Sequence, residues 1–128
     1  MEAAQRLLEA KERYPACAEH WAQATAAAFI MLTREVCAEV AKPEWWNDEG
    51  LKALSARVVW AAPDDEIALR MRAGVLSGAC GAWEPGPRSA AELKEAATHY
   101  DRAAALSPAP AMKAELTKLA DFCRSRAE

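Results

Sequence analysis

The sequence predicts an all-α fold in which six helices form three antiparallel hairpins. Alanine supplies about a quarter of the 128 residues, and this composition, with frequent Leu, Glu, Lys and Arg, favours helix over strand. Apolar residues recur at intervals of three and four along several segments, which is the spacing of a buried helical face. Proline and helix-capping residues separate these segments. We expect residues 1–128 to form a single domain, because a chain of this length supports one continuous core.

The first three expected helices are separated by prolines. Their expected ranges are Glu2–Tyr14, Ala16–Ala41 and Asp48–Ala61. Pro15 ends the first helix, and the second ends before Pro43, because a proline disfavours helix at the residue that precedes it. Asn47 is the expected N-cap of the third helix, since its side chain can accept a hydrogen bond from the first turn. Pro63 then ends the third helix.

The last three helices have stronger start signals. Their expected ranges are Asp65–Ala82, Ala90–Leu106 and Pro110–Arg126. Acidic residues 64–66 complement the positive end of the fourth helix. Ser89 and Glu92 have the spacing of a capping box, which predicts the start of the fifth helix. Pro108 separates the fifth helix from the sixth.

The proline junctions recur at a nearly constant interval. Pro15, Pro63 and Pro108 are 48 and 45 residues apart, and each stands between two expected helices. The pattern A-x3-[YL]-x2-A-x4-P ends at Pro108, where it includes Ala96, Tyr100 and Ala103, and it recurs before Pro15. Repeats of 20–50 residues are typical of stacked helical arrays. The sequence therefore predicts a single helical-repeat domain with junctions near these three prolines.

These residues resemble the second helix of the tetratricopeptide repeat (TPR), which has small residues and an aromatic residue at the same offsets before a proline. The resemblance covers most of the chain and is strongest over Ala90–Pro108. The repeats here are longer than the 34 residues of that family. The resemblance implies a short right-handed TPR-like α-solenoid with one concave and one convex surface. A compact helical bundle is the alternative arrangement.

The resemblance also implies which residues face the concave groove. In the family, the first helix of each repeat faces that groove, and in this chain the corresponding helices follow the three prolines. The implied groove residues are Glu19, Ala22, Phe29, Ile67, Arg70, Met112 and Glu115. They include no cluster of Lys and Asn that would clamp a terminal carboxylate. The resemblance therefore implies an apolar groove that accepts a helix or an extended peptide of another protein.

Tryptophans in the predicted loops form a second candidate contact surface. Trp45, Trp46 and Trp83 lie in segments rich in Pro and acidic residues, where they either seal the helices or meet a partner. The sequence favours sealing, with contact to a partner as the alternative. Trp60 is different, because it lies near the end of an expected helix and is expected in the core.

Residues with catalytic or metal-binding chemistry form no recognisable motif. The two histidines, His20 and His99, have no second His or Cys at ligand spacing. The sequence also lacks a nucleophile elbow, a phosphate-binding glycine loop and an HExxH motif. It therefore predicts no enzyme activity, no metal ion and no cofactor.

Charge, cysteines and hydropathy restrict the partners and the compartment. A net charge of −3 argues against nucleic acid, whose protein partners usually have a basic face. The most apolar run, Trp21–Leu32, is shorter than the roughly 20 residues of a membrane span. The four cysteines match no metal or disulfide pattern and are expected to be buried thiols in a reducing, cytoplasmic compartment. They are Cys17, Cys37, Cys80 and Cys123.

Taken together, these features predict a non-catalytic protein-protein interaction module that acts as an adaptor, a subunit or an assembly factor of a larger complex. Two other functions stay open. The alanine-rich stretch "ATAAAFIML" is compatible with a helical bundle whose interior holds a small apolar ligand. An enzyme whose polar groups meet only in space is the other alternative, and His99 with Tyr100 would be its first candidates.

Overall fold

A computed structural model describes residues 18–33, 44–78 and 83–128 of this chain. These residues form five helices joined by turns and loops, with no strand among them. The helices are α2 (Ala18–Thr33), α3 (Asp48–Ala61), α4 (Glu66–Ser77), α5 (Ala90–Leu106) and α6 (Pro110–Arg126). The expected first helix, Glu2–Tyr14, the Pro15 junction and the end of the expected second helix lie outside the described residues. Within the described residues, no helix is both long and apolar enough to cross a membrane.

The capping signals of the sequence are confirmed for two helices. The Asn47 side chain accepts a hydrogen bond of 2.8 Å from the N–H of Gly50, in the first turn of α3. Ser89 and Glu92 form the reciprocal capping box at the start of α5, with bonds of 3.1 and 3.0 Å. These local bonds satisfy backbone N–H groups that have no partner inside the helix. The bounds of α3 and α5 therefore agree with the expected ranges.

Helix α4 is shorter than expected, and carbonyl groups at its C-terminus accept hydrogen bonds from side chains. Gly78 follows it with a φ of 67°, a left-handed conformation that glycine adopts without a steric penalty. The expectation that this helix continues to Ala82 is therefore wrong. Arg88 donates to the carbonyl of Val75 at 2.9 Å, and Arg126 donates to the carbonyl of Ser77 at 3.0 Å. The two cations stand at the negative end of the helix dipole, where they are stabilising.

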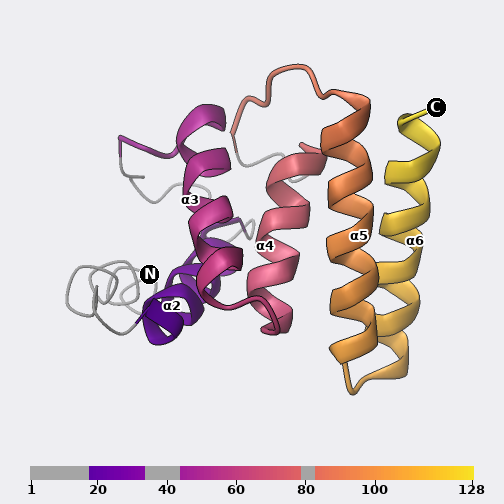
Figure 1. The fold of residues 1–128 in the computed structure, drawn as a ribbon, viewed down its shortest axis with the longest axis horizontal. Helices are drawn as coiled ribbons and strands as arrows, with labels where there is room; N and C mark the ends of the chain where they lie inside the picture. The colour runs from indigo at the N-terminus through magenta and orange to yellow at the C-terminus, as the bar shows by residue number, and fades with distance from the viewer. Residues whose placement is uncertain (1–17, 34–43, 79–82) are drawn as a thin grey trace.

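The helices α3, α4, α5 and α6 lie side by side in chain order and alternate in direction (Figure 1). Pro63 lies in the turn between α3 and α4, and Pro108 lies in the turn between α5 and α6. Helix α2 packs against both α3 and α4. As a result, α4 has α2 and α3 as neighbours on one flank and α5 on the other.

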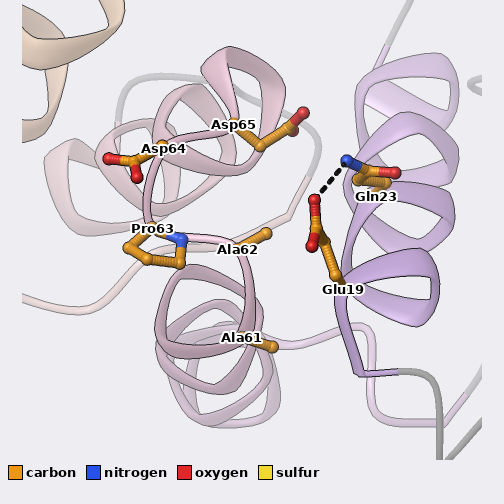
Figure 2. Close-up of a pocket in the computed structure, with 7 residues that line it drawn as sticks. All are labelled: Glu19, Gln23, Ala61, Ala62, Pro63, Asp64 and Asp65. Carbon is orange, nitrogen blue, oxygen red and sulfur yellow. Dashed lines mark hydrogen bonds between the residues drawn. The ribbon is translucent and has the colours of Figure 1, made fainter.

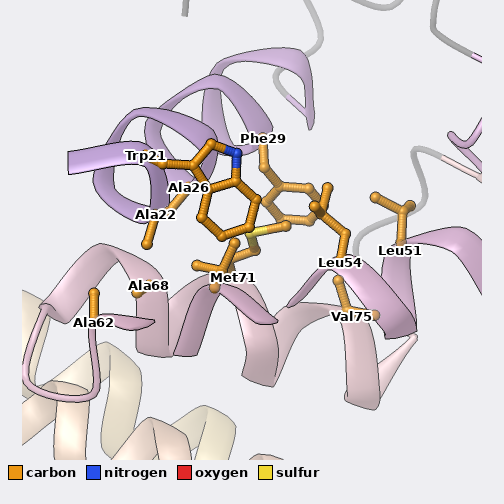
Figure 3. Close-up of a cluster of buried hydrophobic side chains, with 11 residues drawn as sticks. Trp21, Ala22, Ala26, Phe29, Leu51, Leu54, Ala62, Ala68, Met71 and Val75 are labelled. Atoms are coloured by element: carbon orange, nitrogen blue, oxygen red, sulfur yellow. The ribbon is translucent and has the colours of Figure 1, made fainter. Parts of the chain in front are cut away.

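Two hydrophobic clusters meet at α4. The first joins α2, α3 and α4 and is drawn in Figure 3; it contains Trp21, Ala22, Ala26, Phe29, Leu51, Leu54, Val58, Ala62, Ala68, Met71 and Val75. The second joins α4, α5 and α6 and contains Leu69, Ala73, Leu76, Ala96, Ala97, Tyr100, Ala103, Ala104, Leu116, Ala120 and Cys123. One face of α4 contributes to the first cluster and a different face contributes to the second, so this helix connects the two halves of the described fold.

The two alanines and the tyrosine of the pattern before Pro108 are buried in the second cluster. Ala96 and Ala103 are fully buried, and Tyr100 is 6 % exposed. Small side chains at these positions let the backbones of neighbouring helices approach closely. Cys123 is a buried free thiol in the same cluster, and burial raises its pKa. The other three cysteines lie outside the described residues.

Trp60 does not lie in the core, and the expectation for it is wrong. Its exposed fraction is 84 %. The buried positions of α3 are Leu51, Leu54, Ser55 and Val58, which share one helical face. At 3.6 residues per turn, Trp60 points about 200° away from Val58. This angular position therefore puts Trp60 on the solvent side of α3.

Ion pairs fasten α5 to the α3–α4 hairpin. Lys52 pairs with Glu92 at 2.7 Å, and Arg72 pairs with Glu95 at 3.1 Å. Arg72 also donates to the Lys52 carbonyl and the Ser55 hydroxyl, at 2.8 and 3.1 Å. These contacts fix the position of α5 beside α4, and so they place the α5–α6 hairpin relative to α2.

Candidate binding groove

An open groove of about 370 Å³ lies between α2, α4 and the α5–α6 hairpin. Figure 1 shows the arrangement of the helices that form it. The residues that line it are mostly apolar: Phe29, Ile30, Thr33, Arg70, Gly74, Tyr100, Met112, Glu115, Leu116 and Leu119. We call this feature the α2–α6 groove. Both hydrophobic clusters reach its surface, through Phe29 from the first and through Tyr100 and Leu116 from the second.

The α6 and α4 walls of the groove follow the helical spacing of the sequence. Helix α6 contributes Met112, Leu116 and Leu119, which are four and three residues apart and therefore share one side of the helix. Helix α4 contributes Arg70 and Gly74, one turn apart. Because Gly74 has no side chain, it leaves space between the walls. Helical spacing therefore explains which residues share the α6 wall and which share the α4 wall.

The structure brings together four of the seven groove residues that the family resemblance implied. Phe29, Arg70, Met112 and Glu115 all line the α2–α6 groove. The remaining three, Glu19, Ala22 and Ile67, lie elsewhere. Glu19 is exposed and lines a separate pocket, Ala22 is fully buried, and Ile67 is partly buried against the first cluster.

Sequence reasoning missed the other six residues that line the groove. They are Ile30, Thr33, Gly74, Tyr100, Leu116 and Leu119. A signal was available in α6, where Leu116 and Leu119 continue the spacing that begins at Met112. Tyr100 gave no such signal, because it belongs to α5 and contributes to the second cluster as well as to the groove.

The polar groups of the groove differ in how fully they are engaged. Arg70 pairs with Glu66 on the same helix, at 3.9 Å between Nη1 and Oε1. The Thr33 hydroxyl donates to the carbonyl of Ile30 at 2.7 Å. Glu115 is exposed, and no hydrogen bond or ion pair joins it to any residue that the structure describes. It is therefore a carboxylate beside an apolar surface, available to a partner.

A smaller pocket of about 180 Å³ lies where α2 meets the turn between α3 and α4 (Figure 2). Its carboxylates already have local roles. Glu19 accepts from Gln23 at 3.4 Å, and Asp65 accepts from the N–H of Ala68 at 2.9 Å as the N-cap of α4. Asp64 accepts from Arg102 at 3.1 Å. The pocket therefore contributes to the turn and the helix cap, and it has few free polar groups.

The three loop tryptophans are partly buried and pack against the first cluster. The ring centroid of Phe29 lies 5.5 Å from that of Trp46 and 5.9 Å from that of Trp83. Trp45 lies 6.0 Å from Trp46. This aromatic group supports the α2 wall of the groove from behind, since Phe29 belongs to both. The geometry agrees with sealing as the role of these side chains.

Asp48 anchors the loop of residues 83–89 to the start of α3. Its carboxylate accepts from the Arg88 guanidinium, from Trp83 Nε1 at 3.1 Å and from the N–H of Gly86 at 3.2 Å. The Arg88 side chain is 2 % exposed and also contacts the C-terminus of α4. The hydrogen bond from Arg88 holds the pKa of Asp48 well below its usual range. This contact connects α3, α4 and the Trp83 loop.

The histidines do not meet Tyr100 at the groove. His99 Nε2 lies 3.0 Å from Glu95 Oε2, on the side of α5 where Arg72 contacts the same carboxylate. Burial opposes a low pKa at Glu95, but the His99 hydrogen bond and the Arg72 charge lower it. Tyr100 lines the groove from the next position on the helix. His20 is exposed at the start of α2.

Comparisons with known proteins give no relative for this chain. No protein-family model matches the sequence, and neither curated proteins nor solved structures give a match. The geometry and chemistry of the α2–α6 groove are therefore the basis for a functional proposal.

Proposed function

We propose that this chain is a non-catalytic protein-binding module that acts as an adaptor, a subunit or an assembly factor of a larger complex. The observation that carries the proposal is the α2–α6 groove, an open channel with apolar walls from α2 and α6. Apolar grooves of this kind bury the side chains of a partner and gain the free energy of removing apolar area from water.

The open shape favours a segment of a protein over a small molecule. Small-molecule sites are concave enough to bury about 70–90% of the surface of their ligand. The α2–α6 groove is open to solvent along one side, so a small apolar ligand would remain partly exposed in it. A protein segment can fill the groove with a few side chains and make further contacts along the rim. The small-ligand alternative is therefore the weaker candidate.

The same groove supports a TPR-like arrangement of hairpins. The helices that follow the three prolines in the sequence are α2, α4 and α6, and all three contribute to the lining. These are the helices that the family resemblance assigns to the concave surface, and a solenoid presents such a surface to its partners. We propose this arrangement, with the Pro15 hairpin as its first member, and a reducing compartment suited to the buried thiol of Cys123.

The proposal is tested by site-specific photo-crosslinking. A photoreactive phenylalanine analogue replaces Met112 in the groove, and in a matched protein it replaces Trp60, which is exposed on α3 outside the groove. Both proteins are irradiated in an extract of cells that express the chain. We expect a protein adduct from position 112 and none from position 60.

Competition separates groove binding from other contacts. Excess unlabelled wild-type chain should remove the adduct, whereas excess Met112→Gln/Leu119→Gln variant should not. Gln has a size and helix propensity similar to those of Met and Leu, and both residues are partly exposed, so the variant should fold. Equal adducts from both positions, or equal competition by the variant, would count against the groove. Loss of competition in a Trp45→Ala/Trp83→Ala variant alone would move the site to the loops.

A further inference from the structure

We infer that the occupant of the α2–α6 groove is an amphipathic α-helix that places a basic residue beside Glu115. The inference rests on the proposed function and gives the chemistry of the partner. Three features of the groove support it: the hydrogen bonding of its backbone groups, its volume with the spacing of the side chains on α6, and the carboxylate of Glu115.

The backbone groups of the walls favour a helix over an extended peptide. The residues that line the groove belong to α2, α4, α5 or α6, and most of their backbone N–H and C=O groups bond within these helices. The exceptions are the N–H of Met112, in the first turn of α6, and the C=O groups in the last turn of α2, which have no backbone partner in the described helix. An extended peptide exposes its own backbone groups and needs partners for them. The polar side chains of the lining are few: Arg70, Glu115, Tyr100 and Thr33, and the hydroxyl of Thr33 already donates to the carbonyl of Ile30. The backbone groups inside a helix already hydrogen-bond to one another, so burying them against apolar walls leaves no backbone group without a partner.

The size of the groove suits a few anchoring side chains. An apolar cavity of about 150 Å³ accommodates a benzene-sized group. At about 370 Å³, the groove has room for two or three apolar side chains of that size. An amphipathic helix presents this number from positions i, i+3 or i+4, and i+7. Met112, Leu116 and Leu119 have the same spacing on α6, so ridges of one helix can fit between those of the other.

The carboxylate of Glu115 at the rim favours a basic residue in the partner. Arg70 already has Glu66 as a partner on the same helix. Glu115 is exposed, and nothing among the described residues pairs with it. A basic residue of the partner helix beside Glu115 would form an ion pair at the edge of an apolar contact. An acidic residue there would meet a like charge, and the net charge of the chain, −3, would add to the repulsion.

The inference is tested with a display library of random 16-residue peptides selected on the full chain. The same library is selected in parallel on the Met112→Gln/Leu119→Gln variant, and peptides that both proteins retain are discarded. A Trp60→Gln variant is the matched control, because it also removes an exposed apolar side chain but leaves the groove intact. Peptides that depend on the groove should bind this control as well as they bind the wild type.

The sequences of the retained peptides decide the outcome. Enrichment of Leu, Ile or Phe at helical spacing, with Lys or Arg on the flanks, supports the inference. Enrichment of alternating or proline-rich sequences, or of acidic flanks, overturns it but leaves the proposed function standing. If no peptide distinguishes the wild type from the groove variant, the proposed function fails together with the inference.

Charge reversal at the rim provides a second measurement. The Glu115→Lys variant should bind the selected basic peptide about 2- to 10-fold more weakly, as expected when an exposed ion pair becomes a like-charge contact. It should bind an acidic version of that peptide more tightly than the wild type does. Glu84→Lys is the matched control, because Glu84 is exposed in a loop and does not line the groove. Equal effects of the two variants would show only a net-charge effect and would overturn the role of Glu115.

Discussion

Replacing Asp48 with Asn should destabilise the fold strongly, because it leaves a buried cation without its counter-charge. The Arg88 side chain is 2 % exposed and the Asp48 side chain is 20 % exposed. Removing one partner of a buried ion pair costs about 3–5 kcal/mol of unfolding free energy. Because Asp48 is partly exposed, we expect a value of about 3 kcal/mol, at the lower end of that range.

Urea unfolding measures this loss. For a small domain the unfolding free energy falls by about 1–3 kcal/mol per molar urea, so the midpoint of Asp48→Asn should lie about 1–3 M below that of the wild type. Asp64→Asn is the matched control. Asp64 is 86 % exposed and pairs with an exposed arginine, so its replacement should change the unfolding free energy by less than about 1 kcal/mol.

The same variant should have a characteristic dependence on pH. The pKa of Asp48 in the folded chain lies below its ordinary value of 3.8. The folded state then stabilises the ionised carboxylate, so this contribution is complete above the ordinary pKa and declines as the pH falls toward the folded pKa. The difference between wild type and Asp48→Asn should therefore be constant near neutral pH and should shrink below pH 3.8. A difference under 0.5 kcal/mol at neutral pH, or one unchanged at acidic pH, would refute the role assigned to this contact.

Three further predictions concern packing, backbone conformation and capping. Ala103→Leu should overpack the second cluster and lower the unfolding free energy by about 1–3 kcal/mol, whereas Ala105→Leu, on the exposed side of the same helix, should have little effect in thermal unfolding. Gly78→Ala should cost about 1–2 kcal/mol in urea unfolding, because a β-carbon at a φ of 67° is strained and would lie 3.2 Å from Arg88 and Pro85 side-chain atoms; stability equal to the wild type would exclude the left-handed conformation. Ser89→Ala should cost about 1 kcal/mol through loss of the α5 cap, and Ser89→Asp should restore most of it; equal midpoints for all three proteins would contradict the capping box.

The parts of the fold that could be predicted from sequence are those with local chemical signals. The cap residues Asn47 and Ser89 act within three residues of their own positions, so the starts of α3 and α5 could be read directly. Proline positions gave the turns at Pro63 and Pro108 for the same reason. The end of α4 could not be read in this way. Nothing in the sequence says that Gly78, of the glycines near it, adopts the left-handed conformation.

The groove was predictable only one helix at a time. The family resemblance implied Arg70 on α4 and Met112 with Glu115 on α6 as groove residues. The resemblance did not say which other residues lie beside them. Tyr100 reaches the groove from α5, and Ile30 reaches it from α2, because of how α4 is packed between two clusters. Those positions depend on tertiary contacts that no local spacing encodes.

The position of α4 also explains why the groove stays open. Helix α2 is held in the first hydrophobic cluster, and α6 is held in the second. Closing the groove would require α2 or α6 to slide over α4, and either movement would separate buried side chains from their own cluster. The ion pairs of Arg72 with Glu95 and of Lys52 with Glu92 further fix α5, and through it α6, relative to α4. A helix that binds as proposed would therefore meet walls that are already in place, so less ordering free energy would be lost on binding.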